Sequence, residues 1–145
     1  MAANQLKIEN ALHQAIKNDE LRLHYQPKIE AATGRIAGFE GLLRWKNLQL
    51  GDVSPSIFVP VAEHSGQITA IGKWVRLNAC KQFRTWLDMG LMVGSISINL
   101  SGVELLQKDL PNQIQELLDA GVPGVHIYTL NRAEVVVELM EGLKL

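Results

Sequence analysis

The stretch Thr33-Gly-Arg-Ile-Ala-Gly-Phe-Glu-Gly-Leu-Leu-Arg-Trp45 decides how the fold begins. Arg35 to Trp45 predicts a strand, and Ala32-Thr-Gly34 in front of it is typical of a turn. The segment before the turn, Leu21-Arg-Leu-His-Tyr-Gln-Pro27, alternates apolar and polar residues with the period of a strand. Residues 21–45 are therefore predicted to form a β-hairpin.

The segments on either side of the hairpin predict alternating helices and strands. Apolar residues recur at offsets of three and four in the helical segments, Ser54-Pro55 is a strong helix start, and Gly90 is a typical helix end. Ser101 and Glu104 have the spacing of a capping box. The predicted helices are residues 4–18, 55–63, 68–90, 110–118 and 131–141, and the later strands are residues 93–100 and 125–128. This alternation implies parallel strands joined by helical crossovers.

Composition excludes several classes of protein. The chain has 145 residues, 47% hydrophobic and 20% charged, which fits one globular domain. Its net charge of −1 offers no basic surplus for a nucleic acid polymer. No apolar run reaches the ~18 residues of a membrane span, the N-terminus does not resemble a signal peptide, and the single cysteine, Cys80, cannot form an internal disulfide. We expect a cytoplasmic protein with no membrane partner.

Four polar residues at strand positions are candidates for a functional site. Gln26 and Glu40 lie in the hairpin, and Arg44, four residues after Glu40, shares its strand face. Asn99 closes the next strand. A carboxylate and an amide oxygen at strand ends suit a hard cation, and arginine suits a phosphate. On spacing alone, a surface ion pair between Glu40 and Arg44 and a turn-capping Asn99 are the simpler interpretation.

Five motifs in order and spacing give these residues more weight: Tyr25-Gln-Pro-Lys-Ile29, Thr33 to Trp45, Phe58-Val-Pro-Val-Ala-Glu-His-Ser-Gly66, Ile71-Gly-Lys-Trp-Val75 and Ser97-Ile-Asn-Leu-Ser101. Over about residues 5–110 the chain resembles the N-terminal half of EAL domains, the bacterial cyclic di-GMP phosphodiesterases. The signature reads Glu40-Gly41-Leu42, with glycine in place of the usual alanine. The resemblance implies an α/β fold, a partial (β/α)₈ (TIM) barrel of about four strands built from a hairpin and βα units. A complete barrel takes about 250 residues.

The resemblance also implies roles for the four candidates. Glu40 and Asn99 match two metal ligands of the family, Arg44 matches the arginine that contacts a substrate phosphate, and Gln26 lies in the nucleotide-facing first strand. The role of Glu63, in the family's Ala-Glu-x-x-Gly stretch, stays open. The later glutamates, the Asp-Asp pair and the lysine of the family have no counterpart in the chain. We therefore expect a vestigial site without catalysis and without a cofactor, with Mg²⁺ or Mn²⁺ bound only if another chain completes it.

The tail resembles a different family. Val122-Pro-Gly-Val-His-Ile-Tyr-Thr-Leu-Asn-Arg132 lies within residues 117–143, which are similar to the last strand and helix of methylenetetrahydrofolate reductase, another (β/α)₈ barrel. Tyr128 and Arg132 match positions near the folate and nicotinamide of that family, although a structural role is the simpler interpretation. We expect a single domain in which residues 1–110 and 111–145 differ in ancestry, as an engineered or recombined barrel chimera. A natural truncated gene is the alternative.

Four strands cannot close a barrel, so sheet edges stay open. We expect a homodimer that covers them, or a monomer shielded by its helices at 4–18 and 131–141. Three functions stay open. The first is a scaffold without catalysis, the second is a degenerate cyclic di-GMP binding module, and the third is a phosphodiesterase completed by a partner chain.

Overall fold

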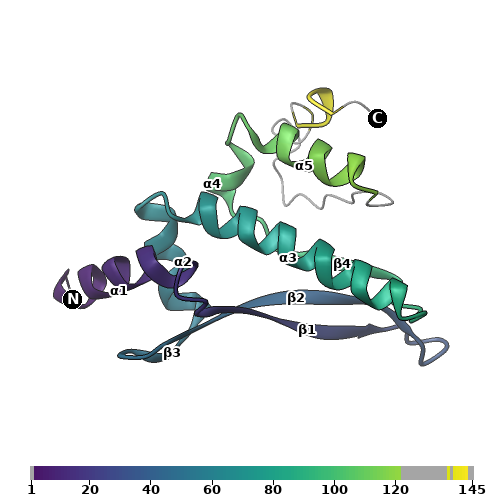
Figure 1. The fold of residues 1–145 in the computed structure, drawn as a ribbon, viewed down its shortest axis with the longest axis horizontal. Coiled ribbons are helices and arrows are strands. Elements are labelled where there is room, and N and C mark those ends of the chain that lie inside the picture. Colours follow the sequence, from purple (N-terminus) through teal and green to yellow (C-terminus); the bar gives the residue numbers. More distant parts are fainter. Residues whose placement is uncertain (1, 122–136, 138, 144–145) are drawn as a thin grey trace. The chain divides into compact units, whose positions relative to one another are not determined.

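The computed structural model of the chain describes residues 2–121, 137 and 139–143. The chain divides into two compact units, residues 1–99 and residues 100–145. The first unit holds the sheet and the longest helix (Figure 1). Its elements are α1 (Ala2–Ala15), β1 (Leu21–Ile29), β2 (Ile36–Asn47), β3 (Gly51–Val53), α2 (Pro55–His64), α3 (Ile68–Asp88) and β4 (Ser95–Ile98).

The sheet of the first unit is mixed, with β2 at its centre. β1 pairs antiparallel with β2 along its whole length, and this confirms the predicted hairpin. β4 pairs parallel with the first half of β2, so α2 and α3 form the predicted helical crossover. β3 pairs antiparallel with the end of β2, and this strand was not predicted from the sequence. Three residues are too short to show a strand period.

Helix α3 covers one face of the sheet, and Figure 1 shows it running along the hairpin. The rings of Tyr25 and Phe39 each lie 5.0 Å from the ring of Trp86 in α3, measured between centroids. Tyr25 and Phe39 belong to β1 and β2, so one indole holds both strands against the helix. The buried apolar residues of this unit are Ile8, Leu12, Ala15, Leu21, Trp45, Phe58, Val61, Ala62, Ile68, Ile71, Val75, Ala79 and Val93.

Helix α3 ends where the sequence predicted. Gly90 has a φ of +76° and follows the C-cap residue Met89. The N–H of Gly90 donates to the carbonyl of Leu87 (2.9 Å), and the N–H of Leu91 donates to the carbonyl of Trp86 (3.0 Å). These two bonds are the Schellman pattern, and glycine takes the left-handed conformation that the pattern requires.

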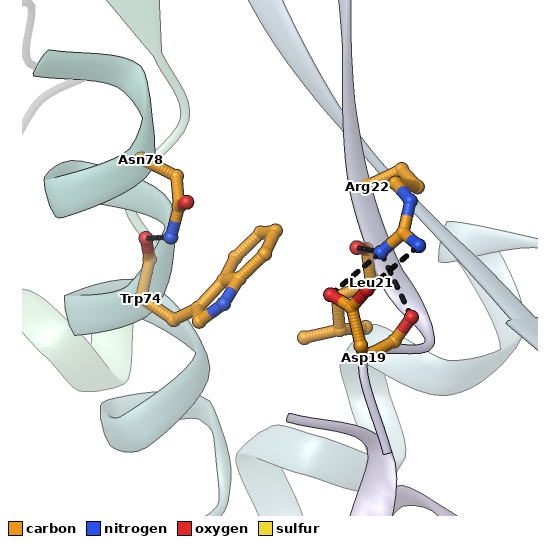
Figure 2. A network of polar contacts seen from close by, with 5 residues as sticks. All are labelled: Asp19, Leu21, Arg22, Trp74 and Asn78. Carbon is orange, nitrogen blue, oxygen red and sulfur yellow. Dashed lines mark hydrogen bonds and ion pairs between the residues drawn. The ribbon is translucent and has the colours of Figure 1, made fainter. Parts of the chain in front are cut away.

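The junction between α1 and β1 is fixed by polar contacts. Figure 2 shows the guanidinium of Arg22 against the carboxylate of Asp19, with Nη1 to Oδ1 at 2.9 Å, and Trp74 projecting from α3 toward the start of β1. Glu20 accepts hydrogen bonds from Trp45 Nε1 (2.9 Å) and Asn47 Nδ2 (3.0 Å). Glu20, the residue directly before β1, is thereby tied to the end of β2.

The second unit contains α4 (Gly102–Leu105) and α5 (Leu110–Asp119). The predicted capping box is confirmed, because Ser101 Oγ accepts from the N–H of Glu104 and Glu104 Oε2 accepts from the N–H of Ser101. Leu110 and Ile114 are buried with Leu139 and Leu143, and Leu105 and Leu118 pack against this cluster. This unit therefore has a small apolar core of its own.

Some predicted boundaries change. The first helix spans residues 2–15 rather than 4–18, because Asp19 takes a left-handed φ of 54° and the chain turns into β1. The third predicted strand shortens from 93–100 to 95–98. The predicted strand at 125–128 and most of the predicted helix at 131–141 lie outside the described residues, although residues 137 and 139–141 are helical. Within the described part of the chain, no helix is long and apolar enough to cross a bilayer.

Candidate functional site

The sheet face opposite α3 is mostly polar, with Leu42 as an apolar member. Gln26 lies opposite Glu40 in the β1–β2 register, and Glu40 lies opposite Ser97 in the β2–β4 register. Residues directly opposite one another share a face, and the face repeats every second residue. The polar sheet face, as we call it below, carries Arg22, His24, Gln26, Lys28, Glu40, Arg44, Ser95, Ser97 and, just after β4, Asn99.

Two of the predicted site residues are in contact. Asn99 Nδ2 donates to Glu40 Oε1 at 3.0 Å across 59 positions of sequence. Asn99 directly follows β4, as expected, whereas Glu40 lies within β2 rather than at a strand end. The parallel pairing of β2 with β4 brings Glu40 beside Ser97, and the chain reaches Asn99 two residues later.

The other two predicted residues flank this pair. Gln26 is exposed on β1, directly across from Glu40. Arg44 is exposed, four residues along β2, and its Nη1 donates to the carbonyl of Leu43 at 3.1 Å. Among the described residues no ion pair joins Arg44 to Glu40, so the simpler interpretation of these two residues as a surface pair is not what the structure shows.

Sequence reasoning missed the contact between Lys28 and Ser97 on this face. Lys28 Nζ donates to Ser97 Oγ at 2.6 Å, from β1 to β4. Gly38 lies opposite Lys28 on the intervening strand, and the lysine side chain crosses above it. The alternation that places Gln26 on this face also places Lys28 there, two residues later. This two-residue period is the sequence signal that could have identified Lys28.

The described residues do not fit a divalent cation on their own. Mg²⁺ takes six oxygen ligands, and Glu40 and Asn99 offer one carboxylate and one amide. Throughout residues 2–121, 137 and 139–143, no cluster of three or more His, Cys, Asp or Glu residues is placed to hold a metal. The amide of Asn99 also turns its Nδ2 toward Glu40, which occupies the carboxylate with a hydrogen bond.

Three further residues had open roles. Glu63 lies half-buried in the last turn of α2, so it does not belong to the strands that carry the polar sheet face. Tyr128 and Arg132 lie outside the described residues.

Comparison with known proteins identifies the family. The sequence model of the EAL domain matches residues 9–139. The chain belongs to the EAL family. This match confirms the resemblance that the five motifs indicated, and it extends past residue 110 to residue 139.

Two curated relatives are much longer than this chain. The chain is 36% identical over 143 residues to the oxygen sensor protein DosP of Escherichia coli, covering 99% of the chain and 17% of DosP. It is 41% identical over 117 residues to MucR of Pseudomonas aeruginosa, a bifunctional diguanylate cyclase/cyclic di-GMP phosphodiesterase, covering 81% of the chain and 17% of MucR. The chain thus spans about a sixth of either relative.

A solved structure gives the fold. The PaMucR phosphodiesterase in its complex with c-di-GMP superposes with a TM-score of 0.80 at 32% identity, over 94% of the chain and 60% of that chain. The EAL fold is an α/β barrel of the TIM type, and the described sheet and helices form an incomplete part of such a barrel. The predicted fold class is therefore confirmed.

Proposed function

We propose that this EAL segment binds cyclic di-GMP through its polar sheet face and that the 145-residue chain does not hydrolyse the dinucleotide by itself. The observation that carries the proposal is the contact of Asn99 with Glu40 beside Gln26. It brings three of the four residues that the EAL motifs single out onto one exposed patch of sheet.

The chemistry of this face supports binding of a cyclic dinucleotide. Gln26 and Asn99 offer amide donors and acceptors for base or ribose groups, and Arg44 offers a planar fork for a phosphate. The PaMucR structure holds c-di-GMP in a domain that is 32% identical to this chain. Arg44 is exposed and bonded only to the backbone next to it among the described residues, so its guanidinium is available to a ligand.

The same face argues against hydrolysis by this chain. Two-metal cleavage of a phosphodiester requires a set of carboxylate ligands that holds both cations. Glu40 is the one carboxylate of the polar sheet face. Glu40 alone leaves most of the cost of dehydrating a divalent cation without compensation.

Calorimetric titration of the purified chain tests both parts. We expect heat with cyclic di-GMP at micromolar concentrations, little dependence on added Mg²⁺, and about tenfold weaker binding in Arg44→Ala. Arg35→Ala, which removes an exposed arginine from the hairpin turn, is the matched control and should bind normally. No heat at high micromolar ligand rejects the binding role. Linear dinucleotide appearing by chromatography would overturn the absence of hydrolysis.

A phosphodiesterase completed by a partner chain is the second candidate. Within the described residues β1 and β4 each pair with β2 alone, so each keeps one free edge for another strand. A homodimer is the simplest way to cover both edges. Light scattering at high protein concentration tests this, and a single species of 16.1 kDa would reject it.

The chimera stays a prediction from the sequence. It rests on the similarity of residues 117–143 to methylenetetrahydrofolate reductase. The EAL model and the DosP alignment both extend through the suggested junction at residues 110–120. An experimental structure in which residues 125–128 pair beside β4 as the next strand of an EAL barrel would contradict the chimera.

A further inference from the structure

The contact between Lys28 and Ser97 bridges the full width of the polar sheet face. Lys28 lies on β1 opposite Gly38, and Ser97 lies on β4 opposite Glu40. The 2.6 Å bond from Lys28 Nζ to Ser97 Oγ therefore passes over the central strand. Ser97 is the register partner of Glu40, so the bond ends beside the carboxylate that accepts from Asn99.

Gly38, the register partner of Lys28, also packs closely against β4. A Cβ built on Gly38 would lie 2.6 Å from Ser95 Oγ and 2.7 Å from the carbonyl oxygen of Ser95, closer than packed atoms allow. Any larger residue here would stand between β1 and β4 on the polar face. The close approach of β2 to Ser95 on β4 therefore leaves room for glycine alone at this position.

The groups that the Lys28–Ser97 contact leaves available for a ligand are hydrogen-bond donors. An ammonium group has three N–H donors and no acceptor, and one of them is used by Ser97. The Ser97 hydroxyl accepts that bond and so keeps its own O–H free to donate. Lys28 is exposed, and its ammonium has Ser97 as its one partner among the described residues. The pair presents up to three donors and one positive charge.

Phosphate oxygens are the ligand that this donor set recognises. Lysine binds phosphate as a point charge, and hydroxyl and amide donors complete the contact. We propose that Lys28 and Ser97 form a phosphate-binding subsite of the polar sheet face, beside the Glu40–Asn99 pair. Its assignment to a phosphate of a bound cyclic dinucleotide rests on the proposed function, whereas its affinity for a phosphate group as such does not.

Titration with inorganic phosphate, followed by NMR of the ¹⁵N-labelled chain, tests the subsite itself. We expect the amide signals of Lys28, Ser97 and their strand neighbours to shift, and the shifts to vanish in Lys28→Met. Lys28→Arg, which keeps the charge, should retain them. Lys73→Met removes an exposed lysine from α3, changes the net charge equally, and should behave as the unchanged chain. Absence of any shift at Lys28 and Ser97 would overturn the subsite.

Calorimetry with cyclic di-GMP then separates this inference from the proposed function. We expect Lys28→Met to weaken binding about tenfold and Ser97→Ala to weaken it less, because the hydroxyl is uncharged. Equal binding of cyclic di-GMP by Lys28→Met and by the unchanged chain would show that the dinucleotide does not use this subsite. Phosphate shifts without any dinucleotide binding would overturn the proposed function and leave the phosphate subsite standing.

Discussion

Asn99 Nδ2 donates to Glu40 Oε1 at 3.0 Å, although 59 positions separate the two residues in the chain. The bond joins the residue after β4 to the centre of β2, and both groups are partly open to solvent. Exposed hydrogen bonds contribute little to the free energy of folding, because water replaces either partner. The Glu40–Asn99 bond therefore has more to do with the arrangement of the site than with holding the fold.

Replacement of Asn99 should separate these two effects. In Asn99→Ala we expect the free energy of unfolding to fall by less than about 1 kcal/mol. Binding of cyclic di-GMP should weaken about tenfold, since both the amide and the orientation of Glu40 are lost. Urea denaturation and calorimetry measure the two quantities. Asn112→Ala removes a comparable exposed bond, to Asp109 in the second unit, and should leave binding unchanged. A large stability loss with intact binding would contradict this division.

Glu20 ties the start of β1 to the end of β2. Burial alone raises the pKa of its carboxyl, but the hydrogen bonds from Trp45, Asn47 and Asn18 outweigh burial and hold the pKa below its usual value. Trp45 is fully buried, so its indole N–H depends on this acceptor. Glu20→Gln should lower the free energy of unfolding by roughly 1–2 kcal/mol. Glu30→Gln, in the exposed hairpin turn, should have a smaller effect, and equal losses would contradict the role of Glu20.

The lowered pKa of Glu20 predicts a dependence of stability on pH. Because the folded pKa lies below the unfolded one, the stabilisation is complete above about pH 4.3 and is lost as the pH falls through the folded value. The urea midpoint of the unchanged chain should therefore drop below about pH 4 more steeply than that of Glu20→Gln. Parallel pH profiles of the two proteins would show that Glu20 does not contribute.

Gly94 sits where the chain enters β4. Its φ is +64°, and a Cβ built there would lie 2.1 Å from the carbonyl oxygen of Ala37. Gly94→Ala should therefore cost more than about 2 kcal/mol, since either β4 or β2 must move. Gly51→Ala has a similar φ of +70° with no atom within 4 Å of the added carbon, and should cost about 1 kcal/mol. Urea denaturation compares the two, and equal costs would contradict the steric argument.

Cys80 is the single cysteine of the chain and lies half-buried in α3. Burial raises the pKa of its thiol, so less thiolate is present at about pH 8 than in a free cysteine. We expect Ellman's reagent to react several-fold more slowly with the folded chain than with the chain in denaturant. Equal rates would show that the thiol is open to solvent.

The sequence predicted the elements that have a clear period or a strong boundary. The hairpin follows from alternation, α3 from its apolar spacing and Gly90, and the capping box from Ser101 and Glu104. β3 was not predicted because its conformation depends on pairing with β2, and the side chains of Gly51–Val53 show no strand pattern of their own. Tertiary pairing decided its conformation.

The candidate site was predictable in membership but not in geometry. Strand positions singled out all four candidates, alternation along β2 put Glu40 and Arg44 on one face, and the EAL motifs gave the four residues more weight. The strand register decided which of these side chains meet. Register depends on long-range pairing, which local sequence does not encode. It placed Gln26 across from Glu40, left Arg44 away from the Glu40–Asn99 bond, and brought Lys28 to Ser97.

The crossover through α2 and α3 also sets the order in which this face assembles. The hairpin of β1 and β2 closes through a short turn, whereas Ser97 and Asn99 arrive only after a loop of more than fifty residues has closed. Loop closure costs entropy that is recovered only once α3 packs on the strands, so we expect the pairing of β4 with β2 to form after the hairpin. A peptide of the hairpin alone would display Gln26, Lys28 and Glu40 without their partners. Ligand recognition on this face would therefore report that the whole first unit has folded.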